Sequence, residues 1–183
     1  PEARSGLAMM DIDGDGRLDL LVHDAQGFEV FQWHEDQQTL ESRYRFDGSV
    51  ESLLPVVHEV SLGPSVIGVR QESVGWTLNW WAPGRARYNF VGIEPTGKSS
   101  TADGMRSNAS GLGTQLVARV GQHWTVLDKL DDYSGPGQSD QPLVLGLGER
   151  DFADFIKLYW SDGVLQTEMA LEAGKVHRVE EYQ

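Results

Sequence analysis

An internal repeat constrains the fold of the first half of this chain. A shift of about 48 residues aligns two copies of one pattern: strand, loop, strand, glycine turn and a strand with an aromatic end. The aligned pairs are Met9 with Val57, Gly27 with Gly75, and Trp33 with Trp81. Repeats of this period with several strands are typical of propeller blades, and one blade cannot bury both faces of its sheet. We therefore expect residues 1–84 to form two blades of a partial β-propeller.

Short β-rich runs between turn residues predict an all-β protein along the whole chain. The 21 glycines and 7 prolines agree with many short strands. The predicted strands are 18–22, 28–33, 66–69, 76–81, 115–120 and 155–160. Residues 165–173 have a helical composition, but Gly163 and Gly174 confine them, and we expect a strand there too. A boundary near Gly84 leaves residues 85–183 for a compact β-sandwich or barrel.

Composition excludes several classes of function. The chain has 183 residues and a net charge of −13, so nucleic acids and anionic membranes are unfavourable partners. It has no cysteine, which excludes disulfides and thiolate metal sites, and no apolar run long enough to span a membrane. No secretory signal follows Pro1, and we expect the chain to be part of a longer, processed protein.

The strongest chemical signal is a run of four aspartates between two predicted strands. Asp11, Asp13, Asp15 and Asp19 occupy positions 1, 3, 5 and 9 of a loop with a glycine at position 6. With the backbone carbonyl of Arg17, these carboxylates predict a site for one hard cation, and the many flexible oxygens favour Ca²⁺ over Mg²⁺. An EF-hand would need Glu at position 12 and flanking helices, and neither is present. The alternative is a solvated acidic turn.

Residues 6–22 closely resemble the FG-GAP/VCBS repeat, the calcium-loop blade of integrin α-subunit heads and many bacterial surface proteins. The resemblance implies that Asp11, Asp13, Asp15 and Asp19 bind Ca²⁺ by side chains and Arg17 by its carbonyl. The second copy, residues 58–66, keeps only Glu59 as an anionic oxygen donor, and we expect no ion there.

The C-terminal part resembles the ASPIC/UnbV domain, which follows such repeats in cartilage acidic protein and in bacterial secreted proteins. The matching segments are 108–113, 134–135, 145–148 and 156–163. The last usually reads Trp-Pro-Asp-Gly, and here Ser161 replaces the proline. No reaction is implied by this resemblance.

Other residues give weaker signals. Trp80 and Trp81 are candidate sugar-stacking aromatics, although packing between sheets or at the domain junction is the simpler interpretation. We expect Trp33, Trp124 and Trp160 in the core. The five histidines have no metal-ligand spacing, and Asp131 with Asp132 is typical of a solvated face. Asn108 matches a glycosylation acceptor, although a turn is the simpler interpretation.

These signals together predict a Ca²⁺-stabilised binding or adhesion module without enzymatic activity. We expect it outside the cell, in the periplasm or on the cell surface. Its partner would be a protein or carbohydrate surface, or upstream blades of the same protein. Two alternatives stay open: an ancillary part of a carbohydrate-active enzyme with its site upstream or at the domain junction, or a scaffold subunit of an envelope complex.

Overall fold

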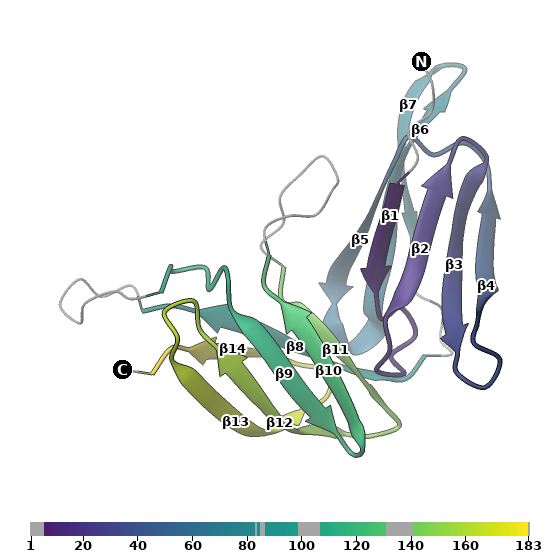
Figure 1. Ribbon diagram of the computed structural model, residues 1–183. Coiled ribbons are helices and arrows are strands. Elements are labelled where there is room, and N and C mark those ends of the chain that lie inside the picture. Colours follow the sequence, from purple (N-terminus) through teal and green to yellow (C-terminus); the bar gives the residue numbers. More distant parts are fainter. Residues whose placement is uncertain (1–5, 83, 85–86, 99–106, 131–140, 183) are drawn as a thin grey trace.

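The computed structural model describes residues 6–82, 84, 87–98, 107–130 and 141–182, and these residues form an all-β molecule (Figure 1). None of the described residues belongs to a helix that could cross a membrane. The first seven strands are β1 (Gly6–Met10), β2 (Asp19–Asp24), β3 (Gly27–His34), β4 (Thr39–Asp47), β5 (Ser52–Glu59), β6 (Gly63–Glu72) and β7 (Gly75–Trp81). The others are β8 (Asn89–Thr96), β9 (Gln115–Val120), β10 (His123–Asp128), β11 (Leu143–Gly148), β12 (Phe152–Tyr159), β13 (Leu165–Glu172) and β14 (Val176–Glu180).

The N-terminal half consists of two antiparallel meanders packed face to face. Strands β1-β2-β3-β4 form one sheet and β5-β6-β7 the other, each in sequence order. Alternate residues of each strand point into a shared core, as the period of a half-buried strand requires. The buried members of this core are Ile12, Leu21, Phe28, Val30, Val50, Leu53 and Val66. The strand pattern of the two sequence copies is therefore present as two consecutive meanders.

The C-terminal half is a two-sheet sandwich. One sheet has the order β10-β9-β12-β13 and is antiparallel, whereas the other has the order β11-β8-β14, with β14 parallel to β8. One hydrophobic cluster joins them, and it includes Ile93, Leu145, Leu116, Ile156 and Leu158. Of the two expected architectures the sandwich is the one that forms, because the described strands make separate sheets and do not close into a barrel.

The pairing of strands changes between β7 and β8, where the boundary near Gly84 was expected. Among the described strands, β1–β7 pair only with one another, and so do β8–β14. The two halves nevertheless contact each other (Figure 1). The Val57 amide donates to Gln141 Oε1 at 2.7 Å, and Phe90 of β8 reaches the turns of both meanders. The N-terminal turns thus rest on the C-terminal sandwich.

The sequence predicted that three tryptophans lie in the core, and the structure confirms this for one of them. Trp160 is buried, with 2% of its surface exposed, as predicted. The prediction was wrong for Trp33 and Trp124, which are 47% and 56% exposed. Both lie on strands whose opposite face supplies the core, through Phe28 and Val30 on β3 and Leu127 on β10.

Candidate functional site: an aspartate loop at the junction

The loop between β1 and β2 curls around the carboxylate of Asp11. Its Oδ1 accepts from the Gly14 amide at 2.7 Å, and its Oδ2 accepts from the Gly16 amide at 2.8 Å. Gly14 and Gly16 both have φ of +88°, a conformation that side chains with a Cβ rarely adopt. The two glycines therefore let the backbone turn twice and present its amides to one carboxylate.

Three aspartates of the loop come together. Single carboxylate oxygens of Asp11, Asp13 and Asp15 lie within 4.8 Å of one another. Asp13 and Asp15 also accept hydrogen bonds from the backbone of the loop. Asp13 Oδ1 accepts from the Asp15 amide at 3.1 Å, and Asp15 Oδ1 accepts from the Arg17 amide at 2.8 Å. These short-range bonds fix the carboxylates on one side of the loop.

The other two predicted ligand residues, Asp19 and Arg17, have different surroundings. Asp19 is buried at the start of β2, where its Oδ2 accepts from the Ile12 amide at 2.8 Å. It lies outside the group of three oxygens but close enough to add to their repulsion. The Arg17 side chain forms an exposed ion pair with Glu35 at 3.6 Å.

Gln32 of β3 is a further member of the site that the sequence did not indicate. Its Nε2 donates to Asp13 Oδ2 at 2.6 Å, and its Oε1 accepts from Arg43 Nε at 2.6 Å. Only the pairing of β3 beside β2 brings Gln32 to the loop, 19 residues from Asp13. A motif confined to the loop cannot contain this signal.

Burial makes the charged state of this loop unfavourable. Desolvation raises the pKa of Asp11 from 3.8 to about 7, the Gly14 and Gly16 amides oppose this, and the charges of Asp15 and Asp19 add to it. Desolvation likewise raises the pKa of Asp19 to about 6, although the Ile12 amide lowers it. Desolvation also raises the pKa of Asp15. The loop holds like charges that a cation would neutralise.

The donor set matches a hard divalent cation. All gathered side-chain atoms are carboxylate oxygens, which Ca²⁺ prefers, and no nitrogen or sulfur ligand is among them. A bound Ca²⁺ would supply the positive charge that the buried carboxylates lack. The residues present therefore fit the ion that the sequence predicted, and Ca²⁺ itself stays a prediction.

The corresponding turn of the second meander is built otherwise. A short 3-10 turn, Val60–Leu62, connects β5 to β6. Glu59 is exposed, and its Oε1 accepts from the Ser61 hydroxyl at 2.6 Å. With one exposed carboxylate, this turn has no counterpart of the Asp11 environment, and the absence of an ion there stays a prediction.

The structure separates the two candidate sugar-stacking tryptophans. Trp81 packs edge-on against Phe28 and Phe46 beside the N-terminal core. Trp80 points to the opposite face, is 55% exposed and contacts the ring of His58. The two rings therefore cannot form one sugar platform, and Trp81 has the packing role that was the simpler interpretation.

Two of the C-terminal motif segments form turns. Asn108 Oδ1 accepts from the Leu112 amide at 2.7 Å and its Nδ2 donates to the Leu112 carbonyl at 2.6 Å, which closes the loop before β9. After β12, the Gly163 amide donates to the Trp160 carbonyl at 2.9 Å. Asp131, Asp132 and residues 134–135 lie outside the described residues.

Comparison with protein families supports the C-terminal resemblance. Residues 104–183 match the family model described as ASPIC and UnbV. That match does not reach the aspartate loop, and the resemblance of residues 6–22 to FG-GAP/VCBS repeats stays a prediction. A search of curated proteins found no match. Strand β8 precedes the matched residues yet is the central strand of one sheet, so the folded unit begins before the match. The family match thus supports an ASPIC and UnbV domain over residues 104–183.

Proposed function

We propose that this chain is a Ca²⁺-stabilised interaction module of a longer protein that is extracellular, periplasmic or on the cell surface. In this proposal β1–β7 are two FG-GAP/VCBS-like propeller blades and the aspartate loop of the first blade binds one Ca²⁺. The observation that carries it is the convergence of carboxylate oxygens from Asp11, Asp13 and Asp15 within 4.8 Å, with Asp11 itself buried and the buried Asp19 close by. We assign no reaction to the chain.

The role proposed for Ca²⁺ is structural. Burial of Asp11 and Asp19 opposes their ionisation, so the loop without a cation must protonate them or bear the repulsion. A ligand present at 100 times its dissociation constant stabilises the folded state by about 2.7 kcal/mol when the unfolded chain does not bind it. Ca²⁺ would therefore lock the connection between β1 and β2.

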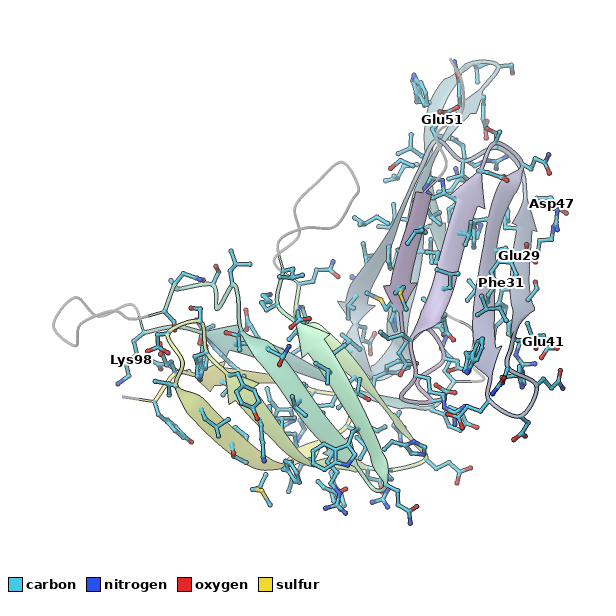
Figure 2. The ribbon with its side chains drawn as sticks, viewed as in Figure 1. Glu29, Phe31, Glu41, Asp47, Glu51 and Lys98 are labelled. Carbon is cyan, nitrogen blue, oxygen red and sulfur yellow. The ribbon has the colours of Figure 1, made fainter. Side chains whose placement is uncertain are left out.

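The outer faces of both N-terminal sheets support a role in protein contacts. On the first sheet, Leu7, Met9 and Trp33 are exposed, and Phe31 lies along β3 beside Glu29 (Figure 2). On the second sheet, alternate residues of β7 are exposed, namely Trp76, Leu78 and Trp80. Exposed apolar groups of this size mark interfaces, and propeller blades cover such faces with neighbouring blades.

We favour protein over carbohydrate as the partner. A sugar platform would use adjacent aromatic faces, and the inward packing of Trp81 leaves Trp80 without its expected companion. Three alternate apolar residues on an edge strand suit the flat surface of another sheet better.

Calorimetric titration of the intact chain with Ca²⁺ tests the proposal. We expect one site per chain, and loss of most of the binding in Asp13→Ala. Asp36→Ala is the matched control because it removes the same charge from an exposed turn outside the loop. Raised NaCl at equal ionic strength separates a specific site from screening of the net charge. Equal binding by both variants, or none by the unmodified chain, would refute the site.

A further inference from the structure

The backbone of the aspartate loop is hydrogen-bonded to the C-terminal half of the molecule. Two contacts reach from the sandwich itself: the Gly148 amide donates to the Gly14 carbonyl at 2.8 Å, and the Thr125 hydroxyl donates to the Gly16 carbonyl at 3.1 Å. A third comes from the connecting segment, where the Tyr88 amide donates to the Asp13 carbonyl at 2.8 Å. Carbonyls of three loop residues therefore depend on partners at least 70 positions away in the sequence.

The loop and β11 also approach more closely than side chains would allow. A Cβ atom on Gly146 would lie 2.0 Å from Asp11 Oδ2 and 2.5 Å from the carbonyl carbon of Gly14. A Cβ on Gly14 would lie 2.8 Å from the ring of Phe90 of β8. Both β11 and β8 of the sandwich thus abut the loop, and Gly146 of β11 lies against the carboxylate of Asp11 itself.

We propose that docking of the C-terminal sandwich and cation binding by the aspartate loop form a single coupled equilibrium, with Thr125, Gly146 and Gly148 as positioning residues. This inference rests on the Ca²⁺ site proposed above. Docking holds the loop carbonyls and so pre-orders the backbone that carries Asp11, Asp13 and Asp15. By thermodynamic linkage, a cation that binds the docked loop better must strengthen docking by the same factor. Ca²⁺ would then fix how the N-terminal sheets sit on the ASPIC and UnbV domain.

Thr125→Val isolates one of these contacts. Valine has the shape and strand preference of threonine but cannot donate to the Gly16 carbonyl. Loss of one hydrogen bond of this kind should weaken Ca²⁺ binding about three- to tenfold. Thr125→Ser keeps the hydroxyl and should bind like the unmodified chain. Thr167→Val is the matched control, because Thr167 is exposed on β13 of the same sheet.

Gly146→Ala gives a stronger perturbation at the close approach. Its Cβ collides with both a carboxylate oxygen and backbone atoms, so the loop or β11 must shift. We expect more than about tenfold weaker Ca²⁺ binding. Circular dichroism of each variant shows whether it folds, and Thr125→Val carries the test if Gly146→Ala does not.

A distance measurement reports docking independently of affinity. The chain has no cysteine, so Asp36→Cys and Met169→Cys place one spin label in each half, the first on an exposed turn and the second on an exposed position of β13. We expect Ca²⁺ to narrow the distribution of label distances relative to EDTA, and Thr125→Val to weaken this response. If the unmodified chain binds no Ca²⁺, the site itself is wrong and the coupling falls with it. If it binds Ca²⁺ while Thr125→Val binds equally well and the label distances do not respond, the site stands and the coupling is refuted.

Discussion

At the scale of single residues, Asp11 is a buried carboxylate surrounded by other acidic side chains. It is 5% exposed, it accepts two backbone amides, and it faces two other negative side chains. The amide bonds favour its ionised form, but burial outweighs them and raises its pKa to about 7. Without a cation, the folded protein therefore retains a proton on Asp11 that the unfolded chain has released above pH 3.8.

This balance predicts opposite effects of pH with and without Ca²⁺. In EDTA the folded state binds more protons than the unfolded state between about pH 4 and 7, so the free energy of unfolding should fall as pH rises through this range. In saturating Ca²⁺ the same carboxylates must lose their protons to act as ligands, so the cation's contribution to stability should rise over that range. Urea unfolding at several pH values, with and without Ca²⁺, measures both effects.

Asp11→Asn provides the control for this prediction. The amide cannot titrate, so the fall in stability in EDTA should become shallower. The remainder would come from Asp15 and Asp19, whose pKa values are also raised, that of Asp19 to about 6. The Ca²⁺ response should disappear. Identical pH profiles for the variant and the unmodified chain would show that Asp11 does not govern the loop.

At the scale of elements, the glycines that begin β6 and β7 show what the turns of the second meander require. Gly63 begins β6 with φ of +75°, and a Cβ there would lie 2.3 Å from Phe90 Cε2. Gly75 begins β7 with φ of +137°, and no atom lies within 4 Å of a Cβ at that position. The two glycines therefore separate the effect of backbone strain from that of a steric clash.

We expect Gly63→Ala to destabilise the protein more than Gly75→Ala. The second change adds only backbone strain, whereas the first must also displace the ring of buried Phe90, which costs about 1–3 kcal/mol more. Thermal or urea unfolding of the two variants gives the difference. Equal losses would mean that the turn of the second meander does not rest on β8.

The sequence predicted where the strands lie better than it predicted which residues they bring together. All six β-rich runs are strands, and residues 165–173, ambiguous by composition, form β13 because they pair with β12. Strand β4 gave no signal, since its residues are nearly all exposed and it is held by pairing with β3. The lack of a local signal also explains why only part of the candidate site was predicted. Spacing alone indicated the aspartates, but Gln32, Thr125 and Gly146 reach the loop through register and docking, which no local pattern encodes.

At the scale of the whole molecule, two packed meanders bury one face each and expose the other. The exposed side of β7 carries Trp76, Leu78 and Trp80, of which Leu78 is 72% exposed. We expect the isolated chain to self-associate through this face when no other partner covers it. Light scattering at increasing protein concentration should show a rising average mass.

Leu78→Glu should reduce this association because it places a charge at the centre of the face. Val126→Glu is the matched control, since Val126 is an exposed apolar residue on β10 of the other half. A chain that stays monomeric at high concentration, or association that Val126→Glu reduces as much as Leu78→Glu, would count against the β7 face.

The central claim, that the aspartate loop holds one Ca²⁺ at the junction of the two halves, is tested most directly by anomalous X-ray diffraction from crystals grown in Ca²⁺. We predict a single anomalous peak per chain among the carboxylates of Asp11, Asp13 and Asp15, with Asp19 and the Arg17 carbonyl completing its ligands. We predict no peak at Glu59. An ion-free loop in crystals saturated with Ca²⁺, or a peak elsewhere in the chain alone, would contradict the claim.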